Sequence, residues 1–507
     1  MGKMLIGWAE ESIIPEKKAS LAGQFFERIS EYVESDITVT AMALEADGEQ
    51  MIMASVDVVN MTEAQIAMAR EKFAKLTNEI EARKLIVNAT HTHTSLVMAG
   101  RDLKRKGGST ISAAAAVLEE FLPDGKKYTK KVVPDETVCS PEEALELVTD
   151  KIALAAKKAW DNRKKAMYAN EFGRAAVGMC RRVSYADGTA QMWGDTNTAD
   201  FVALEGGNDS GVELIYTFDT NKKLTGVVAN IACPAQILEQ RSFISADFWG
   251  RTKAILREKF GKDIYLLALC GAGGDQCPRD LVRWVNPETP IDDPNVNRPN
   301  YIERKADPSM YDINGCNRVG KRIANEIISV YEEITEIKDE AIFVHKVIDL
   351  DVPLRKVTQT DYNNAVRELE YYVNKNKDKE RFDFVDNARM HVHAGLIARY
   401  RQQQNQEVVP IEYHIVRWGD VAFATNPYEL FLDYGNRIKA RSKAKQTFIV
   451  QLCCGSHAYL PTEKAEKAGH YSAYVSSGDT GHEGGDLLTR ESITQINALF
   501  DRKEALL

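Results

Sequence analysis

The feature that most constrains the fold is the alternation of short apolar runs with amphipathic, helix-like stretches along the whole chain. One helix-like stretch begins at Thr62 with Gln65 three residues later, a capping box. Another begins at Ser140, with Pro141 and Glu143 in its first turn. Alternation of this kind predicts an α/β fold with mixed β-sheets flanked by helices. The expected strands are 37–46, 51–59, 85–89, 224–232, 264–270, 341–352, 421–425 and 447–452, and the expected helices 64–76, 145–159, 316–334, 361–374 and 380–403.

The chain shows no internal repeat and no low-complexity linker, so residues 1–507 are predicted to form a single catalytic-type domain. Two segments fit neither a helix nor a strand. Residues 101–135 are rich in Lys, Gly and Ala, and residues 278–308 are rich in Pro. Long irregular segments in folded domains are often lids or binding loops, so both are predicted to be inserts near a site.

The overall composition excludes several classes of protein. A net charge of −9 argues against a nucleic-acid partner, because affinity for phosphates depends on clustered Lys and Arg. No apolar run is long enough to span a membrane, and the N-terminus lacks the apolar core of a secretory signal. The 8 cysteines are scattered without a repeated CxxC pattern, which is typical of free thiols in a reducing compartment. The sequence therefore predicts a cytoplasmic protein without a transmembrane segment.

Two predicted strand ends carry residues that could bind a metal ion or a substrate. His91 and His93 follow the run 85–89, and side chains at i and i+2 of an extended segment point to the same side. Both imidazoles can then converge on one ion or one substrate atom. After the run 264–270 comes a glycine-rich turn that ends in Cys277-Pro278. Glycines there permit a tight turn with backbone amides facing a ligand, although neither phosphate-binding motif, GxxxxGK[ST] or GxGxxG, is present.

Several short motifs, taken in order, resemble those of one family. The chain contains Thr90-His91-Thr92-His93-Thr94, Cys233-Pro234 with Ser245-Ala246-Asp247, Gly274-Asp275-Gln276-Cys277-Pro278, Asn426-Pro427-Tyr428-Glu429, and Ala458-Tyr459-Leu460-Pro461-Thr462 followed by His470-Tyr471. Together they resemble the catalytic domain of the neutral/alkaline, non-lysosomal ceramidases, which are zinc-dependent amidases. The resemblance covers most of the chain. It implies a fold like that catalytic domain, without the β-sandwich domain that follows it in the family.

The resemblance implies a Zn²⁺ site formed by His91, Glu429 and Tyr459. The family's second histidine ligand falls on Cys233 in this chain. A thiolate binds zinc readily, so Cys233 can replace the imidazole, and its extra negative charge would make the metal a weaker Lewis acid. Alternatively, Cys233 only packs in the core and the metal is weak or lost. We favour a retained metal, because His91, Glu429 and Tyr459 all stand in motifs that match those of the family.

The resemblance also implies catalytic roles. His93 would transfer protons, Arg181 would hold a substrate oxygen, and Tyr471 would donate a hydrogen bond to the developing oxyanion. Cys277 stands where the family has a catalytic serine. Both a covalent step at the Cys277 thiol and direct attack by metal-bound water stay open, and we favour the water.

The function predicted from the sequence is hydrolysis of an amide in a small N-acyl compound or a related ester. Because the chain ends at Leu507, soon after the last motif, and is acidic, a soluble N-acyl compound is as good a candidate as ceramide. Two alternatives remain: a non-catalytic ligand-binding or sensory protein with this fold, and a metal-independent thiol hydrolase or esterase that uses Cys277. The sequence makes no prediction of oligomeric state.

Overall fold

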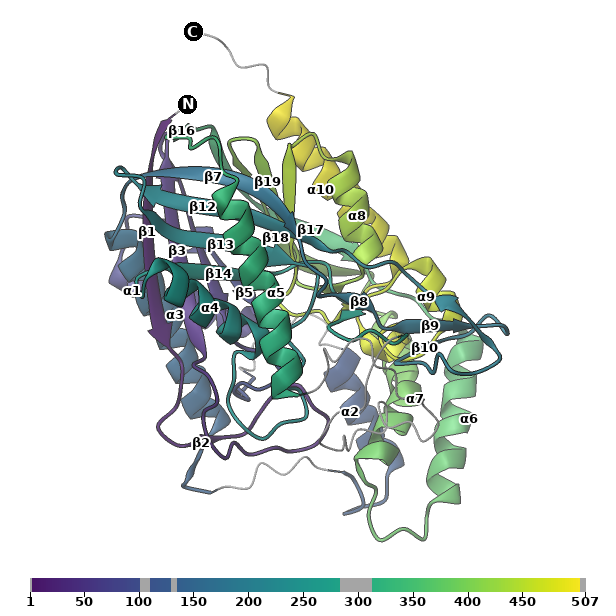
Figure 1. Ribbon diagram of the computed structural model, residues 1–507. Helices are drawn as coiled ribbons and strands as arrows, with labels where there is room; N and C mark the ends of the chain where they lie inside the picture. Colours follow the sequence, from purple (N-terminus) through teal and green to yellow (C-terminus); the bar gives the residue numbers. More distant parts are fainter. Residues whose placement is uncertain (1, 101–109, 129–134, 283–311, 502–507) are drawn as a thin grey trace.

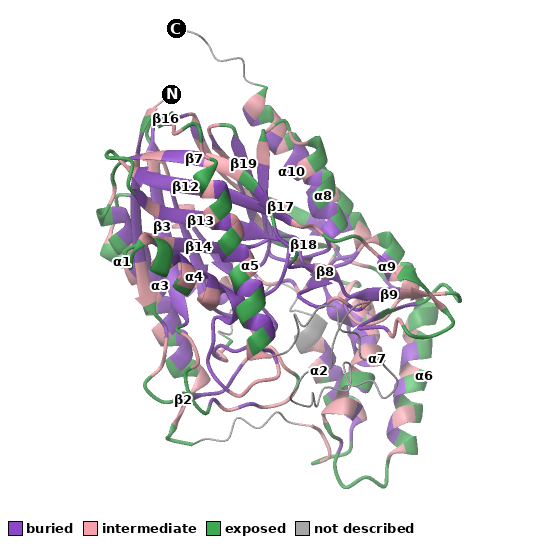
Figure 2. Ribbon diagram, viewed as in Figure 1, coloured by how far each residue is buried: buried purple, intermediate pink, exposed green. Residues whose placement is uncertain are grey.

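Two mixed β-sheets lie face to face, and helices cover the outer face of each, which gives four layers (Figure 1). The computed structural model describes residues 2–100, 110–128, 135–282 and 312–501. The core between the two sheets contains residues of both, while separate cores lie between each sheet and its helices. Figure 2 shows most of the strands buried, except for the edge strand β17, which is largely half-buried, and the outer faces of the helices exposed.

The larger sheet has the order β14-β13-β12-β7-β1-β3-β4-β5, with β16 paired to β1 at one end. Its β4–β5 and β13–β14 pairs are parallel, and its other pairs are antiparallel. The strands are β1 (Gly2–Ser12), β3 (Thr38–Ala46), β4 (Glu49–Val56), β5 (Leu85–Ala89), β7 (Lys164–Arg174), β12 (Gly211–Asp219), β13 (Leu224–Ile231), β14 (Tyr265–Cys270) and β16 (Glu340–Ala341).

The smaller sheet has the order β17-β18-β19-β21, in which only the β19–β21 pair is parallel. Its strands are β17 (Phe343–Pro353), β18 (Val408–Trp418), β19 (Val421–Thr425) and β21 (Gln446–Val450). Short ladders lie beyond the strand ends: β2 (Lys18–Ala19) with β6 (Val138–Cys139), β8 (Met179–Cys180) with β15 (Gln276–Cys277), β20 (Glu429–Leu430) with β22 (Tyr459–Leu460), and β9 (Arg182–Tyr185) between β10 (Ala190–Met192) and β11 (Phe201–Leu204).

The helices form three groups, of which two cover the sheets. The larger sheet is covered by α1 (Glu63–Leu76), α3 (Pro141–Asp161), α4 (Asp247–Phe260) and α5 (Ile313–Glu332), and the smaller by α8 (Leu432–Arg441) and α10 (His482–Phe500). A third group, α2 (Thr110–Phe121), α6 (Gln359–Lys375) and α7 (Phe384–Gln402), packs around its own core beyond the strand ends (Figure 1). The short helices are α9 (Glu463–Ala468), η1 (Ala82–Lys84) and η2 (Val475–Ser477).

The strands of the larger sheet are apolar on both faces because both faces are covered. In β14, Leu266 and Ala268 face the core under the helices, while Leu267 and Leu269 face the core between the sheets. Side chains alternate along a strand, so a strand covered on both faces needs an unbroken apolar run. This explains why the run 264–270 was recognisable in the sequence.

The predicted strands agree with the structure to within a few residues, and both predicted capping boxes are present. The prediction that residues 101–135 form an irregular insert is wrong for their middle part, which forms α2. Residues 101–109, 129–134 and 283–311 lie outside the described residues, and with them most of the predicted insert 278–308. None of the helices in the described part of the chain has both the length and the hydropathy needed to cross a bilayer.

Candidate functional site

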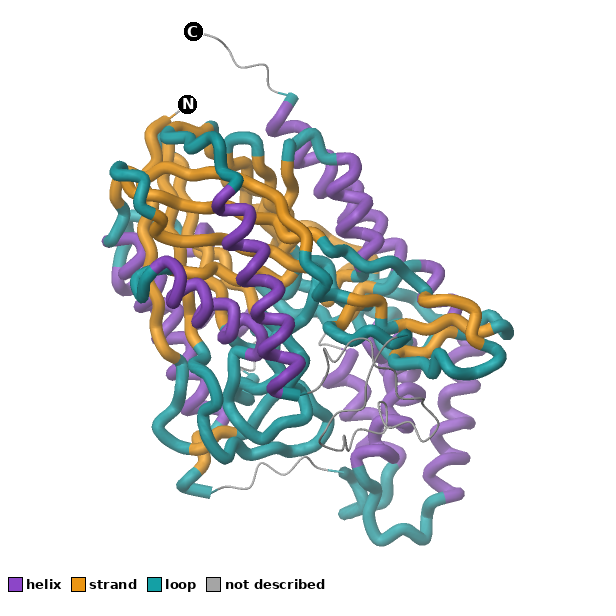
Figure 3. Tube along the Cα trace, viewed as in Figure 1, coloured by secondary structure: helices purple, strands orange, loops and turns teal. Residues whose placement is uncertain are grey.

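The motif segments leave the two sheets at the carboxyl ends of their parallel strands. In α/β sheets this is the edge at which ligands usually bind, because the loops there can converge. Figure 3 shows loops gathered between the strand ends and the helices α2, α6 and α7. Each segment follows a different strand: His91 follows β5, Cys233 follows β13, Cys277 follows β14, Glu429 follows β19 and Tyr459 follows β21.

Three of the predicted metal ligands lie together. Glu429 and Tyr459 are register partners in the β20–β22 ladder. His91 places its Nε2 3.4 Å from a carboxylate oxygen of Glu429. The Nδ1 of His91 lies 2.6 Å from the Val59 carbonyl oxygen, which can only accept, so Nδ1 donates to it and Nε2 is the ring nitrogen that faces Glu429. These are one nitrogen and two oxygen donors of the kinds that zinc uses, and a second contact fixes the imidazole as metal-bound histidines require.

Cys233 is separate from this set. Its side chain is fully buried and its thiol donates to the Pro234 carbonyl oxygen at 3.5 Å. The ligand atoms of His91, Cys233 and Glu429 do not all lie within 4.8 Å of one another. Burial raises the pKa of the Cys233 thiol, and the neighbouring Cys277 raises it further. Its role as a ligand stays a prediction, and the predicted ligands that lie together are His91, Glu429 and Tyr459.

Arg181 and two tyrosines form the polar wall beside these ligands. Arg181 donates to the Gly274 carbonyl oxygen at 2.8 Å and to the Tyr459 hydroxyl at 3.3 Å. The Tyr459 hydroxyl in turn donates to that of Tyr471 at 3.5 Å. Burial opposes the charge of the guanidinium, but Tyr459 and Glu429 outweigh it and raise the Arg181 pKa. Its buried Nε has no hydrogen-bond partner.

Tyr471 keeps its proton at working pH. Burial and the Glu429 carboxylate raise the pKa of Tyr471 to about 12. The hydroxyl therefore stays a hydrogen-bond donor, which is the form that could stabilise an oxyanion.

His93 lies edge-on to His91, with ring centroids 4.8 Å apart. Its Nδ1 lies 3.5 Å from a carboxylate oxygen of Glu239, and its buried Nε2 has no hydrogen-bond partner. Burial lowers the His93 pKa well below its usual value, and the charges of His91 and Arg28 lower it further. Sequence reasoning missed Glu239, because only the fold brings residues 93 and 239 together.

Cys277 is a buried thiol. It is fully covered within a small apolar cluster that includes Val183 and Trp193, and it donates to the Arg279 carbonyl oxygen at 3.5 Å. Burial raises its pKa to about 12, although Arg181 and Arg279 act in the opposite direction. A thiol in this state is a poor nucleophile, because the thiolate is the reactive form.

Four non-glycine residues with left-handed backbone lie at or beside the predicted site residues. They are His91 (φ 65°), Ala458 (φ 56°), His470 (φ 71°) and Ser472 (φ 70°). Ala458 directly precedes Tyr459, and the other two flank Tyr471. This conformation turns the chain sharply at the strand ends and directs the neighbouring side chains inward.

Comparisons with known proteins find the same fold. No protein-family model and no curated protein sequence matches the chain. The crystal structure of neutral ceramidase from Pseudomonas aeruginosa is similar, with a TM-score of 0.66 and 12% identity over 99% of this chain and 75% of that one. A structure described as ceramidase complexed with C2 has the same TM-score and identity, over 99% of this chain and 76% of that one. The likeness confirms the predicted fold class.

Proposed function

We propose that this chain is a metal-dependent hydrolase that cleaves the amide bond of an N-acyl compound, with zinc as the metal. The observation that carries the proposal is the contact between His91 and Glu429 directly beside Tyr459. These donors come from three strand ends that are far apart in the sequence. The fold that the chain shares with the two ceramidase structures adds to this support.

His91, Glu429 and Tyr459 would hold the zinc ion, which when bound supplies a Lewis acid for the amide carbonyl and activates water. His93 would take the proton from the attacking water and return it to the leaving amine. Its unpartnered Nε2 supports this role, since a base needs a free lone pair within reach of the proton.

Arg181 and Tyr471 would bind the oxygen that gains charge during the reaction. The guanidinium is anchored through Nη2, while its Nε–H has no partner and is free to donate. Tyr471 carries a hydroxyl that stays protonated. Donors already fixed in place lower the barrier because they need not reorganise as the charge develops.

Three aromatic rings packed edge-on in a row support a substrate with an apolar acyl group. Phe25 is 50% exposed, and its ring packs edge-on against Tyr471 at 6.0 Å between centroids. Tyr471 packs in the same way against Tyr459 at 5.4 Å. An acyl chain lying on Phe25 would remove apolar surface from water on both partners, at about 25 cal/mol per Å².

The first experiment measures hydrolysis and metal content together. Purified protein is assayed on a series of N-acyl amines of increasing chain length, ceramide included, and its zinc is determined by elemental analysis. We expect at least one equivalent of zinc and a turnover that a chelator abolishes. His91→Ala should abolish turnover and lower the zinc content by one equivalent, while His393→Ala, on α7, should change neither.

The two alternatives predict different results. A thiol hydrolase would survive chelation and His91→Ala and would be silenced by Cys277→Ala. A binding protein would retain ligands of the series without hydrolysing any of them. Either result would overturn the proposed function.

A further inference from the structure

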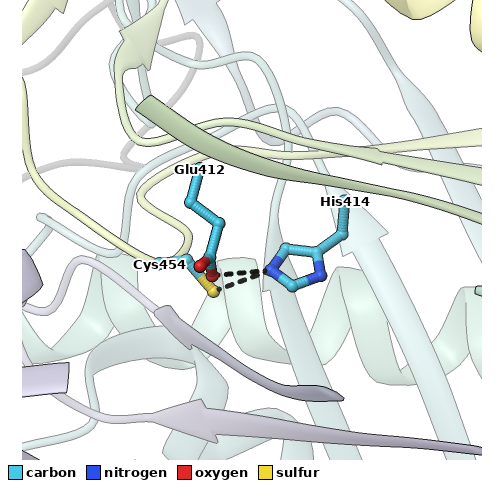
Figure 4. Close-up of side chains that lie close together, drawn as sticks. All are labelled: Glu412, His414 and Cys454. Atoms are coloured by element: carbon cyan, nitrogen blue, oxygen red, sulfur yellow. Dashed lines mark hydrogen bonds and ion pairs between the residues drawn. The ribbon is translucent and has the colours of Figure 1, made fainter. Parts of the chain in front are cut away.

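A second, largely buried group of metal-ligating side chains is made of residues other than those of the candidate site (Figure 4). Glu412 and His414 stand at i and i+2 on β18, on one face of the strand, and Cys454 follows β21. His414 Nε2 lies 3.1 Å from a Glu412 oxygen and 3.3 Å from the Cys454 sulfur. Within the described residues, these are the one set of three His, Cys, Asp or Glu ligand atoms that all lie within 4.8 Å of each other.

The separations match ligands of one ion. Zinc bonds of about 2.0–2.3 Å in tetrahedral geometry place two ligand atoms roughly 3.3–3.7 Å apart. His414 is fully buried and Cys454 is 3% exposed. The His414–Cys454 separation of 3.3 Å falls at the lower end of the zinc range and the His414–Glu412 separation of 3.1 Å just below it, so an ion would need only a small outward shift of Glu412.

A chain of hydrogen bonds orients the His414 ring so that its Nε2 faces Glu412 and Cys454, where a bound cation would take the place of a proton. The Nδ1 of His345 faces the Gln50 carbonyl oxygen at 3.1 Å, so it carries the proton. His345 Nε2 then accepts from the Nδ1–H of His414 at 2.9 Å. A metal-bound histidine usually donates its other ring N–H in this way, which fixes both the tautomer and the ring orientation.

Two arginines determine which cations the group would accept. Arg70 donates to Glu412 at 2.7 Å and to the Cys454 sulfur at 3.4 Å, and Arg83 donates to Glu412 at 2.9 Å. They already balance the negative charge, so a hard cation held by charge and oxygen ligands, such as Mg²⁺ or Ca²⁺, gains little. A cation with partly covalent bonds to sulfur and nitrogen keeps its advantage.

We propose that Glu412, His414 and Cys454 form a second metal site, which takes a borderline-soft divalent cation of the Zn²⁺ or Co²⁺ type. Three protein ligands are one fewer than a closed structural zinc site uses, so one coordination position of the ion would stay open. The Cys454 amide donates to the Val87 carbonyl oxygen on β5 of the larger sheet, and His414 belongs to the smaller sheet. The ion would therefore link the two sheets. This inference does not rest on the proposed function.

The test is a Co²⁺ titration of the full chain carrying His91→Ala, which removes a ligand of the candidate catalytic site. We expect one equivalent of Co²⁺ to give near-ultraviolet charge-transfer absorption from thiolate to cobalt, and Zn²⁺ to displace it. Cys454→Ser should abolish this band, whereas Cys453→Ser, at the adjacent position, should retain it. Zn²⁺ should also raise the melting temperature of the His91→Ala protein.

Three outcomes would overturn the proposal: no charge-transfer band and no thermal shift, a band that survives Cys454→Ser, or a band that is lost instead in Cys233→Ser or Cys277→Ser. X-ray absorption on the cobalt-loaded His91→Ala protein requires no change in the group itself. A cobalt shell without sulfur would overturn the proposal even if the cysteine variants did not fold.

Discussion

At the scale of single residues, the state of Cys277 separates two mechanisms. Its thiol is buried, donates to a carbonyl oxygen and has a pKa raised to about 12. A serine hydroxyl can make the same hydrogen bond. We therefore expect Cys277→Ser to keep kcat/KM on the best N-acyl substrate within about threefold, a change of under ~1 kcal/mol in the barrier. A loss of two orders of magnitude with zinc content unchanged would instead indicate a covalent step at this thiol.

Sequence reasoning could group residues that carry a motif but could not place those brought together only by the fold. His91, Cys233, Glu429 and Tyr459 were predicted as one ligand set; the structure places His91, Glu429 and Tyr459 together, and their role as ligands stays a prediction. Glu239 stands alone in the sequence, and its position beside His93 depends on how two distant loops pack. Glu412 and His414 carried a signal, the i, i+2 spacing, but it becomes readable only once 408–418 is known to be a strand.

At the scale of elements, the turn between β14 and β15 positions the site through one close approach. A Cβ on Gly274 would lie 2.3 Å from the carbonyl oxygen of Glu429 and 2.7 Å from its carbonyl carbon. Both are backbone atoms, so β20 would have to move. We expect Gly274→Ala to destabilise the protein by about 1–3 kcal/mol and to lower both zinc content and kcat/KM.

Gly207→Ala is the matched control for this turn, because a Cβ there meets nothing within 4 Å. It should leave stability, zinc and turnover unchanged. Equal effects of the two substitutions would show that the close approach of Gly274 to Glu429 is unimportant.

A buried ion-pair group joins β1 to α4 and should make stability depend on pH. Glu10 accepts from Lys253 and from Arg257, each at 2.9 Å. Burial raises the Glu10 pKa, but the two cations outweigh it and lower the pKa from 4.5 to about 2. The carboxylate therefore contributes about 3 kcal/mol above pH ~4.5, and this is lost as the pH falls towards ~2.

Urea unfolding across this pH range tests whether the Glu10 ion pairs make the unfolding free energy depend on pH. Glu10→Gln should lower the unfolding free energy at pH 7, and the difference from the parent should disappear near pH 2. Glu332→Gln is the control, since its partner Lys259 lies 3.4 Å away and both side chains are about half exposed or more. Exposed pairs of this kind contribute little. A Glu10→Gln effect that persists unchanged at pH 2 would contradict the assignment.

Elements were predictable where both faces of a strand are covered. The runs behind β5, β14 and β19 are almost wholly apolar, and the structure confirms them. The strands β7 and β18 were missed because Lys, Glu, Asn and Pro interrupt their apolar pattern. Glu412 of β18 lies in ion pairs with Arg70 and Arg83, and Asn170 of β7 donates to Gln446, contacts that only tertiary structure supplies.

At the scale of the whole molecule, the core between the two sheets should couple the unfolding of one sheet to that of the other. Phe423 in the smaller sheet is fully buried there and stacks on Phe448 at 4.6 Å, while Trp418 packs against Tyr168 of the larger sheet at 5.1 Å. We expect Phe423→Ala to cost about 3–5 kcal/mol. Circular dichroism and tryptophan fluorescence should then follow a single, earlier melting transition. Two separate transitions would show that the sheets unfold independently.

The left-handed residues beside the site have an evolutionary consequence. Such a backbone costs a non-glycine residue about 1–2 kcal/mol, and glycine avoids this cost. A chain that no longer used this end of the molecule would be free to drift to glycine at Ala458 or Ser472 and to become more heat-resistant. A higher melting temperature of Ala458→Gly or Ser472→Gly would measure what the present residues cost. The strain would then be a stability that this end of the molecule gives up to keep its present backbone.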